Sequence, residues 1–339
     1  MGVAIASLFP KKEIKLEDLK NKVVGIDFFN VTYQFLSSIR SQDGSLLQDS
    51  QGRTTSHLMG LFTRSLNLMS RGLKLVYVID GEAPELKNKE KALRSARKER
   101  AKEKYDEAIE EENLEAMYKF SKQFVKLDNS ILKESRELLE ALGIPVIQAP
   151  SEGEAQIAFM NKQGDVWCTA SQDADSLLFG SPRLVKNLTL SQKRKLPGRK
   201  TINTFIELIE LKDLLSNLGI NQDQLIVLGI LTGTDFNPGG VKGIGPKKAL
   251  KLIKEEKDFG IIFSKFETNF DWKEIFNLFK KDIKTTSNYK LIWNNIDIEK
   301  VKNILVKEHD FNEARVLSLI EKYQKENKDI KQKGLNEFF

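Results

Sequence analysis

The chain of 339 residues contains only one cysteine and two histidines, two residue types that often take part in catalysis or metal binding. The single cysteine, Cys168, excludes an internal disulfide and a cysteine-rich zinc site. With only His57 and His309, neither a histidine-ligated metal centre nor a Ser-His-Asp hydrolase is expected. Any reaction that this protein catalyses must therefore depend on carboxylates, lysines, arginines and metal ions.

Long apolar runs are also missing. No stretch approaches the ~18 consecutive apolar residues of a membrane-spanning helix. The apolar patch Val3–Phe9 has no basic region before it, which argues against a secretory signal. Met1-Gly2 does not begin a myristoylation motif, because Ala6 stands where that motif needs Ser or Thr. We therefore expect an intracellular protein without a membrane anchor, cytoplasmic if the source is archaeal and nuclear if it is eukaryotic.

Charge is abundant but unevenly placed. Lys and Arg together number 54, and Asp and Glu together number 48. The net charge of +6 is small beside these totals, so the distribution of charge along the chain is the more informative property. Between Glu85 and Lys104, nine basic residues stand against four acidic ones, and the acidic patch Glu107–Glu115 follows. Helices this polar bury little surface, so they are expected to project from the fold. A solvated surface helix and a cationic wall for a polyanion both fit this pattern.

Two apolar runs, Lys22–Asp27 and Leu73–Asp80, each stop at an acid. Continuous apolar runs are typical of buried parallel strands. Helical periodicity between the strands predicts an α/β fold, in which a mostly parallel central sheet is flanked by helices. The other expected elements of this part are helices at 30–40, 55–70, 130–142 and 151–161 and strands at 144–148 and 166–170.

Segments 184–190 and 200–208 are expected to extend the sheet with antiparallel strands around the basic loop Lys193-Arg194-Lys195. The region from Leu211 to about Glu326 has mostly helical periodicity. No internal repeat is present. We therefore expect a single domain over residues 1–326 and a flexible tail over 327–339.

Seven acidic residues fall where predicted strands end or helices begin, and the carboxyl ends of parallel strands face the ligand crevice. Singly, each has a structural alternative: Ser151-x-x-Glu154 is a capping box, and an Asp suits a turn or a helix cap. Two carboxylates about 5 Å apart repel by roughly 3 kcal/mol at a dielectric near 20, so a cluster needs cations. All-oxygen ligands suit Mg²⁺ or Mn²⁺. The seven are Asp27, Asp80, Glu152, Glu154, Asp173, Asp175 and Asp235.

These acids stand within strings that resemble the structure-specific 5′ nucleases, and within them the archaeal and eukaryotic flap endonucleases. Any one string is weak evidence, but all occur in the family's order and together cover nearly the whole chain. The Ser-Glu-Gly-Glu string favours the archaeal type. The strings are VGID at 24–27, TTSHL at 54–58, VYVIDG at 76–81, APSEGEA at 149–155, SQDADSLLFG at 171–180 and GVKGIGP at 240–246.

The resemblance implies that the seven acids hold two Mg²⁺ ions, for which Mn²⁺ can substitute. In that family the metals generate the hydroxide that attacks the scissile phosphate and stabilise the leaving 3′ oxygen. The implied activity is that of a 5′ flap endonuclease and 5′→3′ exonuclease of replication, including Okazaki fragment processing, and of repair. The implied catalytic residues are Lys87, Arg94 and Asp175.

Lys87 and Arg94 match the basic residues at the foot of the family's helical arch, which would span about 83–126 here. They are seven residues apart, so both would project from one helix face toward the reacting phosphate. Tyr33 matches the aromatic residue on which a base near the cut stacks. Gly2 matches a near-terminal glycine whose neighbourhood lies beside the active site.

A glycine hairpin followed by lysines resembles the family's helix–hairpin–helix motif, placed here at about 225–258. In the family this motif binds the DNA backbone and one K⁺. Glycines let backbone amides approach a phosphate, and a helix N-terminus adds positive potential. A plain corner between two helices is the alternative. The residues of the motif expected at the DNA are Gly243, Gly245, Lys247 and Lys248.

Other expected DNA contacts are scattered along the chain. Arg315 matches a family position near the pocket for a one-nucleotide 3′ flap, together with Thr54-Thr55. The basic loop at 193–195 either contacts template duplex or is solvated surface. His57 is expected to be structural. The full set of these expected contacts is Arg40, Thr55, Arg97, Lys193, Arg194 and Arg315.

The final residues resemble the peptide by which replication proteins bind a sliding clamp. The spacing Gln-x-x-Leu-x-x-Phe-Phe would let a short helical turn aim its apolar side chains at one pocket. Folding of this segment back onto the domain is the alternative. The expected clamp-binding residues are Gln332, Leu335, Phe338 and Phe339.

Three positions depart from the family pattern. Glu82-Ala83 replaces the usual Lys-Pro, Ala174 replaces a bulkier residue, and Phe236 replaces a tyrosine. Glu82 removes a cation near the base of the arch, which puts substrate contacts there in doubt. Two other functions are the alternatives: a clamp-associated junction binder without catalysis and a two-metal phosphoesterase of small substrates. The partners expected are 5′-flap DNA and the clamp, with no membrane, and the protein alone is expected to be a monomer.

Overall fold

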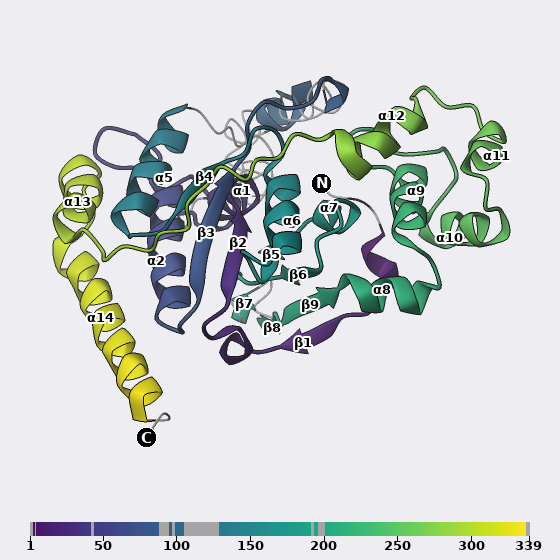
Figure 1. The fold of residues 1–339 in the computed structure, drawn as a ribbon. Coiled ribbons are helices and arrows are strands. Elements are labelled where there is room, and N and C mark those ends of the chain that lie inside the picture. The colour runs from purple at the N-terminus through teal and green to yellow at the C-terminus, as the bar shows by residue number, and fades with distance from the viewer. Residues whose placement is uncertain are drawn as a thin grey trace.

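A computed structural model of the protein describes residues 3, 5–41, 44–87, 95–96, 99–104, 129–190, 193–195 and 201–336. Its centre is a seven-stranded mixed, mostly parallel sheet in the order β1-β9-β6-β5-β2-β3-β4 (Figure 1). The α/β fold expected from the sequence is therefore confirmed. The strands are β1 (Lys12–Ile14), β2 (Val23–Asp27), β3 (Lys74–Ile79), β4 (Val146–Gln148), β5 (Cys168–Ala170), β6 (Arg183–Lys186) and β9 (Ile206–Glu210).

Strand β3 shows why the central strands are apolar throughout. Leu75, Tyr77 and Ile79 pack on one face against the layer of α1 (Phe28–Ser38), α2 (Ser56–Met69) and α5 (Asn129–Ala141). Val76 and Val78 pack on the other face with α6 (Gly153–Gln163). Side chains alternate across a strand, so a sheet covered on both faces needs apolar residues at every position.

The order of the strands creates a crevice at one end of the sheet. The chain runs from β2 through β3 to β4 in one direction, then returns to β5 and β6 on the other side of β2. All four contacts among β2, β3, β4, β5 and β6 are parallel. Their carboxyl ends therefore lie at the same edge, and the reversal at β2 opens the crevice in which ligands of such sheets bind.

Two strand expectations need correction. The basic segment Lys193–Lys195 is not a loop but strand β7, which pairs with β8 (Thr201–Asn203) in a separate two-stranded sheet. Strand β1 also joins the edge of the main sheet, antiparallel to β9, although no strand was expected there. The antiparallel extension itself is confirmed, because β9 pairs with β6 in that sense. Polar strands at an edge lack the apolar run that reveals buried strands.

The region after β9 is mostly helical, as expected. Helices α7 to α12 and the N-terminal residues share a second apolar core. From there an irregular segment, 283–297, crosses α6 and returns to α5, where Asn294 N donates to Gly143 O (3.0 Å). The helices are α7 (Asp175–Leu178), α8 (Leu211–Leu218), α9 (Gln222–Thr232), α10 (Pro246–Glu255), α11 (Phe259–Ser264), α12 (Trp272–Asn277), α13 (Ile298–Lys302) and α14 (Glu313–Asn336).

The C-terminal helix is longer than expected. Helix α14 continues to Asn336, whereas the sequence suggested a tail beginning at residue 327. It extends away from the rest of the fold (Figure 1). The predicted arch at 83–126 falls largely outside the described residues. No helix within the described ranges is long and apolar enough to cross a membrane.

Candidate active site

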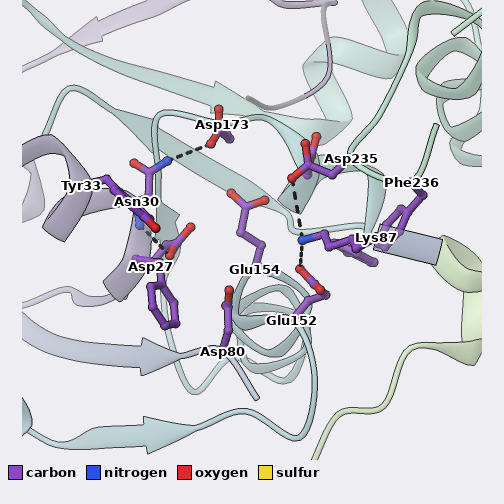
Figure 2. Close-up of a pocket in the computed structure, with 13 residues that line it drawn as sticks. Asp27, Asn30, Tyr33, Asp80, Lys87, Glu152, Glu154, Asp173, Asp235 and Phe236 are labelled. Atoms are coloured by element: carbon purple, nitrogen blue, oxygen red, sulfur yellow. Dashed lines mark hydrogen bonds and ion pairs between the residues drawn. The ribbon is translucent and has the colours of Figure 1, made fainter. Parts of the chain in front are cut away.

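The crevice at the carboxyl ends of the strands contains a cavity of about 330 Å³. All seven acids singled out in the sequence line it, together with Tyr33, Lys87 and Phe236 (Figure 2). They come from segments as distant as β2 and the loop after α9. The fold therefore gathers these carboxylates into one site, while their role as metal ligands stays a prediction.

Asp80 connects two of the elements that build the cavity. It follows β3, and its Oδ1 accepts a hydrogen bond from Gly153 N (2.7 Å) at the start of α6. A Cβ on Gly153 would lie 2.6 Å from this oxygen, so only glycine fits without displacing the carboxylate. The contact directs the N-terminus of α6, and the acids on either side of Gly153, toward the cavity.

The expected capping box at the start of α6 does not form. Glu152 is the N-cap residue and makes no side-chain cap hydrogen bond. The hydroxyl of Ser151 donates instead to Glu82 O (2.9 Å). Glu154 Oε1 is buried and has no hydrogen-bond partner among the described residues. A capping box therefore does not explain these two acids, although Glu154 does lie in the first turn of α6, and both carboxylates line the cavity.

Asp27 and Asp173 are connected by a residue that the sequence patterns did not single out. Asn30, in the first turn of α1, donates its backbone N–H to Asp27 Oδ1 (3.1 Å). Its side-chain Nδ2 donates to Asp173 Oδ2 (2.9 Å) (Figure 2). Asp175, the first residue of α7, accepts a hydrogen bond from Val3 N (2.8 Å). Neighbouring segments thus fix these three carboxylates.

Lys87 lies among the carboxylates at the opposite side of the cavity from Asn30 (Figure 2). Its Nζ forms an ion pair with Glu152, and it lies 3.7 Å from Asp235 Oδ2. The ammonium also lies 5.6 Å from the centre of the Phe236 ring, a cation–π distance. Burial acts to lower the pKa of Lys87, but attraction to Glu152 and Asp235 raises it, so this side chain is positively charged at neutral pH.

Crowding of the carboxylates changes their acidity. Burial, together with repulsion from Glu152, raises the pKa of Asp80 to about 6. Burial and repulsion from Asp235 and Asp173 raise the pKa of Asp175 to about 7. The pKa values of Asp27 and Glu154 rise for the same reasons, with burial the larger cause in each. A site whose anions destabilise one another favours the binding of cations.

The chemistry of the lining fits hard divalent cations. Carboxylate oxygens are the ligands that Mg²⁺ and Mn²⁺ prefer, whereas nitrogen and sulfur ligands suit zinc. Within the described ranges, no three His, Cys, Asp or Glu side chains already surround a single ion position. The seven acids instead line the walls of an open cavity, and Mg²⁺ typically keeps several waters and takes few protein ligands.

The predicted glycine hairpin joins α9 to α10. Gly243 has a left-handed backbone (φ 78°), and Gly245 is the N-cap of α10 with Pro246 at its first turn. A Cβ at Gly243 or Gly245 would meet nothing within 4 Å, so this backbone faces open space. Lys247 and Lys248, in the first turn of α10, are exposed. The geometry leaves amides and ammonium groups accessible to a phosphate backbone.

The expected contacts near a 3′ flap come from two segments that the fold brings together. Ser50 N donates to Asp310 Oδ2 (2.8 Å), and His309 Nδ1 lies 3.0 Å from Asp49 Oδ2. The loop before α2 is thereby joined to the loop before α14. Thr55 lies at the end of the first of these segments and is buried, whereas Arg315 follows the second and is exposed.

The remaining expected site residues differ in how far the structure describes them. Tyr33 lies at the cavity and is 37% exposed, so its ring is accessible. Arg40 donates to Gly44 O (2.8 Å), outside the cavity lining. For Lys193, Arg194, Gln332 and Leu335 only the backbone is described, in β7 and α14. The expectations for Gly2, Arg94, Arg97, Phe338 and Phe339 lie outside the described residues.

Asn30, Phe29 and Phe179 line the cavity but were not expected from the sequence. The signal for Asn30 was its place three residues after Asp27, in the first turn of the helix that Asp27 caps. The two aromatic residues carry no chemistry that a motif would single out. His57 is fully buried, with its Nε2 3.5 Å from Glu134 Oε2, and does not line the cavity.

Comparison with known proteins agrees with this site. The chain matches the models of the XPG N-terminal domain over residues 4–101 and of the XPG I-region over 143–235. It is 47% identical over 340 residues to flap endonuclease 1 of Pyrococcus furiosus, covering 100% of this chain and 99% of that one. The chain belongs to the flap endonuclease 1 family. As a member, it is a nuclease and hence a hydrolase.

Other members of the flap endonuclease 1 family give the same result. The enzyme of Staphylothermus marinus is 47% identical, with both chains covered in full. The structure of flap endonuclease-1 from Methanococcus jannaschii superposes with a TM-score of 0.77 at 41% identity, covering 96% of this chain and 98% of that chain. The catalytic core of Rad2 with DNA shares the fold, with a TM-score of 0.67 at 21% identity over 91% and 95% of the two chains.

Proposed function

We propose that this nuclease cuts DNA at 5′ flaps, and removes nucleotides in the 5′→3′ direction, during replication, including Okazaki fragment processing, and repair. The observation that carries the proposal is the convergence of seven carboxylates and one lysine in a single cavity, in a chain that matches flap endonucleases over its full length. With archaeal relatives such as that of Pyrococcus furiosus, we propose a cytoplasmic, nucleoid-associated protein. We also propose that it is a monomer by itself.

The proposed cofactor is a pair of divalent cations held by the seven acids. Nucleases of this family use Mg²⁺. When bound, two such ions supply an activated water and offset the charge of the attacked phosphate. Asp27, Asp173 and Asn30 lie on one side of the cavity, and Glu152 and Asp235 lie on the other with Lys87 (Figure 2). This division suits two cation positions, one near each group of carboxylates.

Within the described part of the site, Lys87 is the residue proposed to stabilise negative charge on the phosphate under attack. Because its pKa is raised, the ammonium stays charged, and it can donate to a non-bridging oxygen of the phosphate under attack. The Phe236 ring lies at a cation–π distance from this ammonium and adds to its stabilisation. Tyr33 offers an accessible ring at the same cavity, on which a base can stack for about 1–3 kcal/mol. Arg94 is proposed as the second cation.

The proposed DNA path leaves the cavity along the hairpin between α9 and α10. Exposed Lys247 and Lys248 and the open backbone at Gly243 suit a phosphate backbone rather than base edges. One K⁺ in this helix–hairpin–helix is proposed on the same resemblance. The residues at 83–126 are proposed to form the arch beside a single-stranded 5′ end, and recognition is by shape.

The direct test is a labelled double-flap DNA incubated with the protein, with Mg²⁺ and with a chelator. Cleavage near the base of the 5′ flap that requires Mg²⁺ is expected, and an unbranched duplex of the same sequence is the control. Tight binding without cleavage under any divalent cation would instead favour a non-catalytic junction binder. Equal cutting of the flap and control DNA would contradict the proposed specificity.

The end of the chain is proposed to bind a sliding clamp. The backbone at Gln332 and Leu335 is helical, which is the local structure that this peptide spacing requires. Such a tether raises the effective concentration of the nuclease on DNA that carries the clamp, without changing the active site. One domain over 1–326 would then suffice for unassisted cleavage.

Deletion of residues 332–339 should leave unassisted flap cleavage unchanged and abolish its stimulation by the clamp. The measurement compares initial rates with and without clamp, for the full chain and the deletion. A matched variant, with Phe338→Ala and Phe339→Ala, should behave like the deletion while keeping the chain length. Undiminished stimulation in both variants would show that the clamp does not bind here.

A further inference from the structure

Asn30 makes three hydrogen bonds that join two walls of the cavity. Its backbone N–H donates to Asp27 Oδ1 (3.1 Å), and its Nδ2 donates to Asp173 Oδ2 (2.9 Å). Its Oδ1 accepts from Gln172 N (3.1 Å). Figure 2 shows the side chain between Asp27 and Asp173, beside Tyr33. One residue of α1 thus contacts the carboxylate at the end of β2 and the loop that follows β5.

The amide of Asn30 can take only one orientation. Because Gln172 N–H must donate to an oxygen, Oδ1 faces that backbone group, and the Nδ2 hydrogens face Asp173. Asp173 lies in a turn, and its own N–H is held by Ser171 Oγ (3.1 Å). Asn30 therefore fixes both the backbone of this turn and the rotation of the Asp173 carboxylate.

We propose that Asn30 is a positioning residue that sets the orientation of Asp173 relative to Asp27, and thereby the affinity of this side of the cavity for a divalent cation. The inference rests on the proposed function, since it needs a cation at these carboxylates. Asp27 Oδ1 and Asp173 Oδ2 both accept from Asn30, so this residue fixes the rotation of the two carboxylates relative to each other. Hydrogen-bond partners of this kind typically change metal affinity by about 10- to 100-fold when they are removed.

The residue type suits this position. An amide donates to an ionised carboxylate without adding a charge, so it neither competes with a bound cation, as Lys would, nor adds repulsion, as Asp would. The cation at the other side of the cavity is already opposed by Lys87, which pairs with Glu152. On the Asn30 side, the hydrogen bonds that orient Asp27 and Asp173 come from a residue without charge.

The first test measures Mn²⁺ binding to the free protein by electron paramagnetic resonance, with the variant Asn30→Ala. We expect the affinity of one Mn²⁺ to weaken by about tenfold or more. Asn303→Ala is the control, because Asn303 also donates its Nδ2 to a carboxylate, that of Glu308, but in an exposed position away from the cavity. Its Mn²⁺ affinity should equal that of the wild type.

Asn30→Ser is the second variant, in case Asn30→Ala does not fold. Serine is polar but too short to bridge Gln172 and Asp173, so the same weakening is expected. In cleavage assays the Mg²⁺ concentration for half-maximal rate should rise about tenfold, while KM for flap DNA at saturating Mg²⁺ stays unchanged. If Asn30 served only the fold, its replacement would lower thermal stability without raising the Mg²⁺ concentration for half-maximal rate.

Coupling between the two residues provides the last check. In a protein that already carries Asp173→Asn, replacement of Asn30 should no longer weaken Mn²⁺ binding, because its target carboxylate is gone. The inference is wrong if folded Asn30 variants bind Mn²⁺ as the wild type does. It is also wrong if replacing Asn30 weakens Mn²⁺ binding just as much in the protein that carries Asp173→Asn. In both cases the proposed function stands. If the wild type itself binds no Mn²⁺ in the cavity, both are wrong.

Discussion

Single side chains in this protein serve the fold and the site at once. Asp27 caps α1 through Asn30 N, and Asp80 accepts from the first residue of α6, so both acids have the structural role that an isolated Asp suggests. Burial nevertheless raises the pKa of both, with added repulsion from Asp80 on Asp27 and from Glu152 on Asp80. An Asp that only capped a helix could lie on the surface, where it would not be repelled by other buried carboxylates. Burial of these two acids in one cavity therefore favours the proposed cation site over a capping role alone.

Asp175→Asn is expected to slow cleavage strongly while preserving the fold. The amide oxygen can still accept from Val3 N, but the variant loses one charge that would bind a cation. Loss of one such electrostatic contact typically lowers the rate by about 10²- to 10³-fold. Because repulsion from Asp235 and Asp173 is relieved, the metal-free variant should also melt at a higher temperature than the wild type.

The measurements are single-turnover cleavage of flap DNA, DNA affinity with Ca²⁺ in place of Mg²⁺, and thermal unfolding. Asp165→Asn is the matched control, since Asp165 is exposed and accepts from Tyr289 outside the cavity lining. It should change none of the three quantities appreciably. Wild-type cleavage by Asp175→Asn would remove this residue from the proposed catalytic set.

At the scale of elements, the sequence was informative wherever an element is buried. The runs at 22–27 and 73–80 predicted β2 and β3 to within a residue or two, because strands covered on both faces have no polar positions. The same reasoning failed for β1 and β7, whose sequences KEI and KRK lack a continuous apolar run but whose backbones pair as short strands. The bridging role of Asn30 could not be predicted, because it depends on where β5 lies beside β2.

The hairpin between α9 and α10 makes an element-scale prediction. Gly243→Ala should weaken the binding of DNA of any sequence by several-fold, because a Cβ would stand in the open approach to the backbone. Gly164→Ala is the control. Gly164 also has a positive φ (86° against 78°) and nothing within 4 Å of a Cβ, so it carries a similar strain of about 1–2 kcal/mol.

Fluorescence anisotropy with flap DNA and thermal unfolding separate the two effects. Both variants should lose similar stability, and only Gly243→Ala should lose affinity. Equal DNA affinity for the two variants would place the DNA away from this hairpin. The motif itself was visible in the sequence, because a positive φ and an open backbone both demand glycine.

At the scale of the whole molecule, residues from the N-terminal end of the chain and from positions as far along it as 236 complete the cavity. Val3 N holds Asp175, and Asp235 approaches Lys87 from the loop after α9. The order of motifs predicted this gathering, since parallel strands bring their carboxyl ends together. The length of α14 was not predicted, because a polar helix that extends into solvent has no apolar stripe to mark its end.

Acids with raised pKa values couple the stability of the metal-free protein to pH. The folded-state pKa of Asp80 is about 6 and that of Asp175 about 7, against an ordinary value of 3.8. Ionised carboxylates therefore destabilise the fold above these values, and the penalty is lost as the groups take up protons in the folded protein. The free energy of unfolding should rise as the pH falls from about 8 to about 5, and the gain should end near pH 4.

Denaturant unfolding at pH 8 and pH 5.5, with a chelator and with saturating Mg²⁺, measures this coupling. We expect the chelated protein to gain on the order of a few kcal/mol at pH 5.5, and Asp175→Asn to gain less because one titrating group is removed. With Mg²⁺ bound at pH 8 the repulsion is offset, so the protein should already be stabilised there. A chelated protein that is equally stable at both pH values would mean that the seven carboxylates do not repel one another as their arrangement in the cavity requires.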